Sequence, residues 1–365
     1  MSTNGKRASR FRVVLVGCGR ISERHFEAIA AQPALQLVAV CDEVPERAGA
    51  AGERWQVPAF TSLPAMLAET EAEVCVVATP SGVHPKHGIL AAQAGLHVIC
   101  EKPMATRLEE ADALVTACDE AGVHLFVVKQ NRLNPAIQLL KRAVDEERFG
   151  RLYLANTTVR WQRPQSYYDA APWRGTWEFD GGAFMNQASH YVDMIQWLVG
   201  PVDSVSAKTA TLARRIESED TGVALLHFRN GALGVIEVTM LTYPRNLEGS
   251  ITVLGERGTV KVGGTALNRI ETWEFAEYAD MDREAEALKG AANPLSVYGS
   301  GHRPYYENVV RVLRGEATPG TDGREGRKSL ELILAIYESA RAEQQIPLPL
   351  RTFARPEAYR ATVKG

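Results

Sequence analysis

Three segments of the chain hold residues whose types and spacing suit a reaction. Gly17-Cys18-Gly19 follows a short apolar run, Lys102 closely follows another, and His190 stands four residues after Asn186. A glycine-rich turn before a helix presents backbone N–H groups that bind phosphate. Lysine and histidine take up or release a proton when their surroundings bring the pKa near neutrality. The combination favours proton transfer beside a phosphate-bearing ligand.

The glycine turn has the context that a dinucleotide site requires. The strand-like run Arg12–Val16 leads into Gly17-Cys18-Gly19-Arg20-Ile21-Ser22, and helix-forming residues follow. Gly17 permits a tight turn, and Gly19 lets the backbone approach a pyrophosphate at the N-terminus of the helix. Ser22 replaces the usual third glycine or alanine and is still small enough for the helix to pack on the strand. A glycine turn without a ligand is the competing interpretation.

An acidic residue favours the dinucleotide interpretation. Asp42 ends the next apolar run, at about the twenty-residue spacing where a carboxylate bonds the ribose hydroxyls and repels a 2′-phosphate. The sequence therefore predicts NAD rather than NADP. Arg47 could attract a 2′-phosphate, although it is more simply a solvated charge on a helix.

A second loop suited to the cofactor follows the run Val74–Val77. Thr79-Pro80-Ser81 stands directly after this strand, where loops at the carboxyl edge of a parallel sheet pass the cofactor. His84 and His87 follow on the next helix. No cysteine or carboxylate partner accompanies them, so we do not expect them to bind a metal.

A buried strand ends in Glu101-Lys102-Pro103. At the carboxyl edge of the sheet, Lys102 would lie beside the positively charged nicotinamide, which disfavours its ammonium form and lets it help move a proton near neutral pH. Pro103 fixes the backbone there, and a cis bond is one way to do so. The competing interpretation is a pair of charges that caps the strand.

The segment Gly181–Leu198 predicts a helix begun by two glycines. An apolar stripe at helical spacing covers one side, and Asn186 and His190 share the opposite side with Asp193 and Trp197. The glycines would let a ligand approach closely. An active-site role and a structural role for His190 are equally favoured by the residues alone.

These residues need a scaffold, and the pattern between residues 11 and 128 predicts one. Short β-branched runs alternate with alanine-rich segments of helical period, which indicates βαβ units and a parallel sheet. The expected strands are Phe11–Gly17, Gln36–Cys41, Glu73–Ala78, His97–Cys100 and His124–Val128. We expect a disordered tail over residues 1–10, an NAD-binding Rossmann domain over 11–130 and a substrate-binding and oligomerisation domain over 131–365.

The second domain is expected to be α+β, with a large, mostly antiparallel, open-faced sheet. The expected strands are Arg151–Arg160, Val202–Ala213, Thr221–Phe228, Ala232–Leu241 and a hairpin over Ile251–Val262 that turns at Gly255-Glu256-Arg257-Gly258. The expected helices are Pro135–Glu147, Tyr305–Arg314 and Arg327–Glu343.

Composition excludes several classes of protein. The 41 Lys and Arg against 44 Asp and Glu give a net charge of −3 over 365 residues. No positive field is present to attract nucleic acid or an anionic membrane. The five cysteines are odd in number and lack the spacing of metal ligands, so we expect reduced, buried thiols. No stretch approaches the ~20 apolar residues that cross a bilayer, and we expect a cytoplasmic protein.

Together the motifs resemble those of the Gfo/Idh/MocA oxidoreductases over essentially the whole chain after residue 10. The resemblance is carried by Gly17-Cys18-Gly19-Arg20-Ile21, by Glu101-Lys102-Pro103, and by Gly181-Gly182 with Asn186, His190 and Asp193. Within the family, Lys129–Arg132, Arg163–Asp169, Trp173–Trp177 and Gly182–Asp193 look like segments of the nucleotide-sugar 3-dehydrogenases. This implies NAD-dependent oxidation of the C3 hydroxyl of a UDP-sugar, most closely UDP-N-acetyl-D-glucosaminuronate, for a diamino sugar of a surface polysaccharide such as a lipopolysaccharide O-antigen.

The resemblance also implies roles for single residues. Lys102 and His190 would flank the reacting hydroxyl with Asn186, and which of the first two is the base stays open. Many relatives have aspartate where this chain has Asn186, and an amide cannot stabilise an imidazolium as a carboxylate does. The implied NAD-binding residues are Gly17, Cys18, Gly19, Arg20, Ile21, Asp42, Thr79, Pro80, Ser81, His84, Glu101, Lys102, Gln130, Trp173 and Arg174. The implied substrate-binding residues are Lys102, Arg163, Tyr167, Tyr168, Asn186, Gln187, His190, Tyr298 and Arg303.

A uronate substrate needs a partner for its carboxylate. The guanidinium fork of Arg163, or less favourably that of Arg160, suits a bidentate grip beside Tyr167-Tyr168. Pairing of these arginines with strand neighbours is an equal alternative. The loop Tyr298–Arg303 could close over the UDP, or it could be a plain turn before a helix.

The implied partners are the UDP-sugar, further copies of the chain in a homotetramer or dimer, and a pyridoxal-phosphate aminotransferase that acts on the product. No nucleic acid, membrane or metal is expected. The alternative substrates are UDP-N-acetylglucosamine and a free sugar or inositol. A non-catalytic NAD-binding sensor is a different class, and the presence of Lys102 and His190 argues against it.

Overall fold

The structure is a computed structural model that describes residues 10–264, 266–290 and 301–350. The chain divides into two compact units. The first contains residues up to Ala105, Glu109–Val128 and His302–Gly326, and the second contains Thr106–Leu108, Lys129–Gly301 and the chain from Arg327 onward. Residues 302–326, which the sequence analysis placed in the second domain, thus belong to the first unit.

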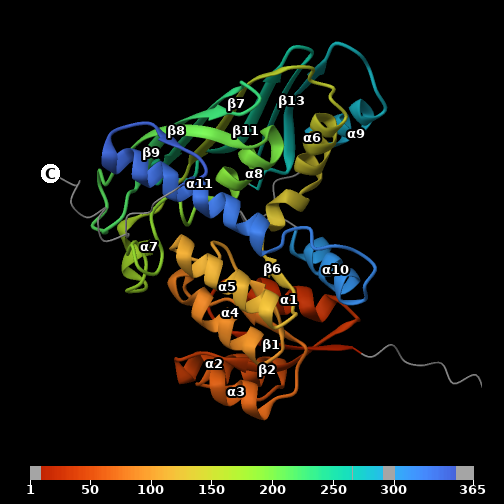
Figure 1. Ribbon diagram of the computed structural model, residues 1–365, viewed down its shortest axis with the longest axis vertical. Coiled ribbons are helices and arrows are strands. Elements are labelled where there is room, and N and C mark those ends of the chain that lie inside the picture. The colour runs from red at the N-terminus through yellow and green to blue at the C-terminus, as the bar shows by residue number, and fades with distance from the viewer. Residues whose placement is uncertain (1–9, 265, 291–300, 351–365) are drawn as a thin grey trace, which may run out of the picture. The chain divides into compact units, whose positions relative to one another are not determined.

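The first unit is built on a parallel sheet of six strands in the order β3-β2-β1-β4-β5-β6, as expected (Figure 1). The strands are β1 (Phe11–Val16), β2 (Leu35–Cys41), β3 (Ala59–Phe60), β4 (Val74–Val77), β5 (His97–Cys100) and β6 (Leu125–Val127). The middle strands are apolar throughout because residues on both faces are buried. The short β3 was not predicted, since two residues carry no recognisable pattern.

Helices join these strands. They are α1 (Ser22–Ala31), α2 (Pro45–Trp55), α3 (Leu63–Glu69), α4 (His84–Gln93) and α5 (Leu108–Glu120), and α10 (His302–Leu313) packs beside α1. The returning segment also covers the edge of the sheet. Thr321 accepts a hydrogen bond from Val127 N (3.0 Å) through its carbonyl oxygen, and its hydroxyl donates to Val127 O (2.6 Å). An otherwise open edge of β6 is thereby paired.

The second unit is built on a sheet of eight strands in the order β13-β12-β11-β7-β10-β9-β8-β14. Every neighbouring pair is antiparallel except β7 with β10, so the expected mostly antiparallel sheet is confirmed. The strands are β7 (Leu152–Arg160), β8 (Val202–Ala210), β9 (Thr221–Phe228), β10 (Leu233–Thr239), β11 (Glu248–Gly255), β12 (Gly258–Gly263), β13 (Arg269–Phe275) and β14 (Ile346–Pro347). The β11–β12 hairpin turns at Glu256 and Arg257, as predicted.

Helices lie on one side of this sheet and leave the other side open. Figure 1 shows α6 (Pro135–Asp145), α8 (Ser189–Val199) and α11 (Gly323–Ala342) on the covered side, and α7 (Gln165–Asp169) and α9 (Met281–Lys289) complete the unit. Strand β9 alternates between buried and exposed residues, as a strand with one covered face must. Its outward Leu225 is 60% exposed, and Leu233 on β10 is 55% exposed.

Among the described residues, no helix is both long enough and apolar enough to cross a membrane.

Candidate functional site

The glycine turn after β1 has the geometry that a dinucleotide needs. Gly17 has a φ of 95°, and a Cβ there would lie 2.5 Å from the carbonyl carbon of Ala78, so only glycine fits. Nothing lies within 4 Å of the position where a Cβ of Gly19 would be. No side chain caps the start of α1, where Ser22 N and Arg24 N donate to the backbone oxygens of Gly19 and Ile21 (3.2 and 3.0 Å). The open space at Gly19 beside the N-terminus of a helix suits a pyrophosphate.

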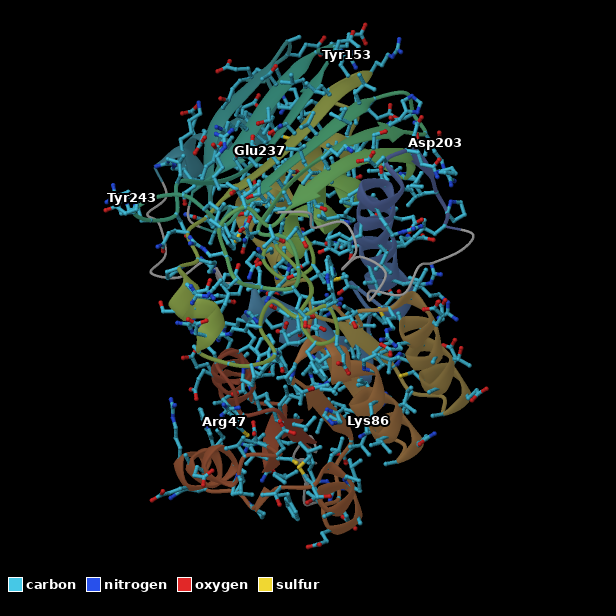
Figure 2. The ribbon with its side chains drawn as sticks, turned by 90° about the vertical axis from the view of Figure 1, so that its left-hand side faces the viewer. Arg47, Lys86, Tyr153, Asp203, Glu237 and Tyr243 are labelled. Atoms are coloured by element: carbon cyan, nitrogen blue, oxygen red, sulfur yellow. The ribbon has the colours of Figure 1, made fainter. Side chains whose placement is uncertain are left out.

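Asp42 is held beside this turn at the end of β2. Its carboxylate accepts hydrogen bonds from Cys18 N (2.8 Å) and Val44 N (2.9 Å). Two backbone donors therefore fix the carboxylate next to the glycine turn, where a ribose hydroxyl can reach it and a 2′-phosphate would be repelled. Figure 2 shows Arg47 at the outer surface of α2, in keeping with a solvated charge.

His84 joins the two loops at the carboxyl edge of the parallel sheet. Its Nε2 lies 2.7 Å from Thr79 O, and its Nδ1 lies 2.8 Å from Pro103 O. Burial lowers the pKa of His84, while these two carbonyl groups favour the protonated ring. Both ring nitrogens contact backbone oxygens of the chain, so His84 would affect a bound cofactor by fixing the two loops that it connects. The Lys102–Pro103 peptide is cis.

Glu101 turns inward and forms a network that sequence reasoning missed. Its Oε1 lies 3.0 Å from His25 Nε2 on α1 and 4.0 Å from His302 Nε2 on α10, and its Oε2 accepts from Lys102 N (3.0 Å). Tyr306 OH lies 2.7 Å from His25 Nδ1. Burial alone would raise the pKa of Glu101, but the hydrogen bond with His25 and the nearby ring of His302 hold it well below its usual range. The carboxylate therefore anchors the main chain at Lys102 to two helices.

Within the described part of the chain, His25, Glu101 and His302 are the group whose side-chain atoms lie close enough together to hold a metal ion. His25 and Glu101 are hydrogen-bonded directly to each other, so each has a partner without a metal ion. Their separation in the sequence is large, so no local motif could have revealed the group.

In the second unit, helix α8 begins at Ser189, and the predicted helix over residues 181–188 is wrong. The chain forms turns there instead. Gly181 has a φ of 73°, which breaks a helix. A Cβ at Gly182 would lie 1.6 Å from Glu219 Oε2, so this glycine makes room for the chain's own carboxyl group rather than for a ligand. Asn186 therefore does not share a helical face with His190.

Glu219 stabilises this turn through hydrogen bonds. Its Oε1 accepts from Phe184 N (2.9 Å) and from Tyr337 OH (2.9 Å). The Tyr337 hydroxyl oxygen in turn accepts from Gly182 N (3.3 Å) and Met185 N (3.2 Å). Burial raises the pKa of Glu219 to about 8. A buried carboxyl group and a tyrosine thus fix the backbone that leads to Asn186 and His190.

Polar partners orient both candidate residues of the turn. The Asn186 amide nitrogen donates to Asp180 Oδ1, while Asp180 Oδ2 accepts from Gly175 N (2.7 Å). His190 Nε2 lies 3.2 Å from Gln130 Nε2. With the amide nitrogen as donor, His190 Nε2 accepts, and the neutral ring carries its proton on Nδ1. The carboxylate of Asp180 is therefore present behind Asn186.

Asp193 pairs with basic residues of the segment before α6. Its carboxylate receives two hydrogen bonds from Arg132 (2.6 and 2.8 Å) and lies 3.5 Å from Lys129 Nζ. Burial would raise the pKa of Asp193, and the charges of Lys129 and Arg132 lower it. The pair joins α8 to the segment before α6.

The remaining predicted substrate residues lie after β7. Arg160 pairs with Glu237 (2.7 Å) and Glu248 (3.1 Å) on neighbouring strands, so the strand-pairing alternative is correct for it. Tyr168 is buried and belongs to the core. Other predicted positions are distributed as follows: Tyr167, Arg163, Trp173 and Arg174 are half-buried, Gln187 is buried, Arg303 is exposed on α10, and Tyr298 lies outside the described residues.

Comparison with known proteins agrees with this geometry. A model of the oxidoreductase family with an NAD-binding Rossmann fold matches residues 11–129, and the model of that family's C-terminal alpha/beta domain matches residues 141–349. A curated relative, the D-apiose dehydrogenase of Paraburkholderia graminis, is 28% identical over 93% of this chain and 90% of its own length.

Two solved structures are much more similar. The WlbA dehydrogenase of Bordetella pertussis, solved with NADH and UDP-GlcNAcA, is 59% identical over 94% of this chain and 99% of its own, with a TM-score of 0.90. The WlbA enzyme of Chromobacterium violaceum, solved with the same ligands, is 56% identical over 95% of this chain and 98% of its own, also with a TM-score of 0.90. The chain therefore belongs to the Gfo/Idh/MocA family of NAD-binding oxidoreductases.

Proposed function

We propose that the protein oxidises the C3 hydroxyl of UDP-N-acetyl-D-glucosaminuronate to a ketone with NAD. The observation that carries this function is the 59% identity, over nearly the full length of both chains, to a dehydrogenase solved with NADH and UDP-GlcNAcA. The glycine turn and the fixed carboxylate of Asp42 supply the cofactor site that the reaction needs. UDP-N-acetylglucosamine and a free sugar or inositol are the alternative substrates.

The reaction removes a hydride from C3 and a proton from the C3 hydroxyl. NAD, when bound, accepts the hydride. The chain's own task is to take the proton, and Lys102 and His190 are the residues we propose for it. The backbone at Lys102 is fixed by Glu101, while Gln130 contacts His190 at Nε2. Asn186, with its amide nitrogen turned to Asp180, presents its carbonyl oxygen as a hydrogen-bond acceptor.

The product is a 3-keto sugar, and an enzyme that transfers an amino group with pyridoxal phosphate is the class that would consume it. We place the reaction in the synthesis of a diamino uronic sugar of a surface polysaccharide, in the cytoplasm. The apolar residues on the open face of the large sheet, including Val223, Leu225 and Leu233, suit contact with a second copy of the chain, consistent with a dimer or tetramer.

The function is tested by the near-ultraviolet absorbance of NADH. Purified protein receives NAD and, separately, UDP-N-acetylglucosaminuronate, UDP-N-acetylglucosamine or myo-inositol, with a 3-keto-sugar aminotransferase and amino donor present to draw the equilibrium forward. Turnover of the uronate above the others is the expected result. Preference for UDP-N-acetylglucosamine would make the neutral UDP-sugar the substrate. Turnover of myo-inositol would support only membership of the oxidoreductase family. Absence of turnover with all three compounds would favour a non-catalytic sensor.

A further inference from the structure

Five side chains in the second unit alternate between aromatic rings and guanidinium groups. The guanidinium carbon Cζ of Arg163 lies over the rings of Trp161 and Tyr167, at 5.1 and 5.4 Å from their centres. The Cζ of Arg174 lies over the rings of Tyr167 and Trp173, at 4.3 and 5.5 Å from their centres. We call this row, from Trp161 to Trp173, the arginine–aromatic ladder. The two arginines stand eleven positions apart and meet on one tyrosine because the short helix α7 turns the chain back.

Neither guanidinium of the ladder has an acidic partner among the described residues. Arg163 donates to Gln162 O (2.7 Å) and Asn246 Oδ1 (3.3 Å), and Arg174 donates to Tyr167 O (2.5 Å), so the acceptors that both guanidinium groups use among the described residues are uncharged. Arg160, three residues before Arg163, shows the contrast, because it pairs with carboxylates. The ladder thus concentrates two positive charges that the chain itself does not neutralise.

The ladder also contains a hydrogen-bond donor that the described residues leave without an acceptor, and a third guanidinium group lies near it. The Nε atom of Arg174 is buried and has no hydrogen-bond partner among the described residues. Arg214 brings a third guanidinium group near the ladder, because its Nε donates a hydrogen bond to the main-chain oxygen of Arg163 (2.7 Å). Two half-buried like charges on one ring repel each other, and a bound anion would relieve that repulsion.

The ring contacts also prepare the guanidinium groups for an anion. A guanidinium held against a ring keeps its N–H edges in the plane, where carboxylate or phosphate oxygens accept two parallel hydrogen bonds. Because the rings already restrict the arginine side chains, little further ordering is needed on binding. A lysine in either place would keep the charge and lose the planar fork.

We propose that the arginine–aromatic ladder binds the anionic oxygens of the nucleotide sugar, with Arg163 and Arg174 acting as a pair. This inference rests on the proposed function and assigns Arg174 and Trp173 to the substrate rather than to NAD. The anionic group is either the carboxylate of the sugar or the diphosphate, which share this chemistry and are separated by the experiment.

The experiment compares Arg163→Gln and Arg174→Gln with the wild-type protein. Arg215→Gln is the matched control, because Arg215 lies in the same region, is 81% exposed in its side chain and lies 3.9 Å from Asp169, off the ladder. Each ladder variant should lower kcat/KM for UDP-N-acetylglucosaminuronate about tenfold to hundredfold, as expected for a lost charged hydrogen bond. The KM for NAD and the unfolding temperature should stay close to those of the control. Lysine at either position should recover part of the loss.

Calorimetric binding of UDP then identifies the source of the anion. Weaker binding of UDP by both variants assigns the ladder to the diphosphate. Unchanged UDP binding, together with loss only for the uronate, assigns it to the sugar carboxylate. An unchanged KM for the UDP-sugar in either variant, or a loss confined to NAD, would overturn the proposal.

Failure of the proposed function gives a different result. In that case the wild-type protein turns over no UDP-sugar, and the ladder is then judged on binding of UDP and of glucuronate to the wild-type protein. Binding of either one that both ladder variants weaken supports the ladder, and absence of binding to both probes rejects it.

Discussion

Replacement of Glu219 by glutamine tests the contacts that hold the turn over residues 181–188. Glutamine keeps the oxygen that accepts from Phe184 N and Tyr337 OH and removes the ability to ionise. Burial is the main cause that raises the pKa of Glu219 to about 8, and the charge of Asp180 acts in the same direction. The hydrogen bonds from Phe184 and Tyr337 oppose the rise without cancelling it.

The raised pKa has a definite consequence for stability. Between the ordinary value of 4.5 and about 8, the folded protein keeps a proton that the unfolded chain releases. The stabilisation is therefore complete below the lower value and is lost as the pH rises through the upper one. At ~1.36 kcal/mol per pKa unit, the difference corresponds to at most about 5 kcal/mol. The variant, which cannot ionise, should gain this amount relative to the wild-type protein across the window.

The assay is urea unfolding at a series of pH values from 5 to 9, followed by circular dichroism. The wild-type protein and a control with the exposed Glu316 replaced by glutamine should lose stability together above pH 5, while Glu219→Gln loses less. The unfolding free energies of variant and wild type should converge at the acid end. Parallel curves for Glu219→Gln and the wild-type protein from pH 5 to 9 would refute the reasoning.

Three further outcomes are expected. Asp42→Ser should raise kcat/KM for NADP, because it removes the carboxylate that repels a 2′-phosphate, and should lower kcat/KM for NAD about tenfold, because it removes the bond to the ribose. Steady-state kinetics with both cofactors measure the two values, and a variant that still does not use NADP would contradict the prediction. Lys102→Ala should lower kcat at least about a hundredfold with little change in the KM for NAD, and retained turnover would exclude Lys102 as the base. Gly182→Ala should lower the unfolding temperature, because the new Cβ would lie 1.6 Å from Glu219 Oε2 and displace its hydrogen bonds. The double variant with Glu219→Ala should recover part of that loss, and no recovery would place the strain elsewhere.

Local patterns predicted the parallel sheet and its glycine turn. Strands β1, β4 and β5 are short apolar runs whose limits agree with the predicted ones within about two residues, because complete burial on both faces leaves an unmistakable pattern. Gly17 could be foreseen because its positive φ belongs to the motif. The β11–β12 hairpin was predictable because glycines flank its turn, although neither Gly255 nor Gly258 has a positive φ.

The helix predicted from Gly181 failed because the decisive contact is distant in the sequence. The apolar residues of the segment are buried, as their spacing predicted. Glu219 and Tyr337, however, accept hydrogen bonds from the backbone of the turn and prevent it from forming a helix. The network of Glu101 escaped prediction likewise, since His302 lies about two hundred residues further along the chain. Hydrophobic periodicity reports which face is buried and contains no information on such remote polar partners.

The return of residues 302–326 to the first unit has a consequence for how the protein is made. Val127 at the edge of the parallel sheet is hydrogen-bonded to Thr321, and His25 Nδ1 lies 2.7 Å from Tyr306 OH. A ribosome that has delivered only the first 130 residues has therefore not yet supplied these partners. The nucleotide-binding half therefore stays incomplete until residues 302–326 have left the exit tunnel, and the last part of the second unit, from Arg327 onward, follows directly behind them.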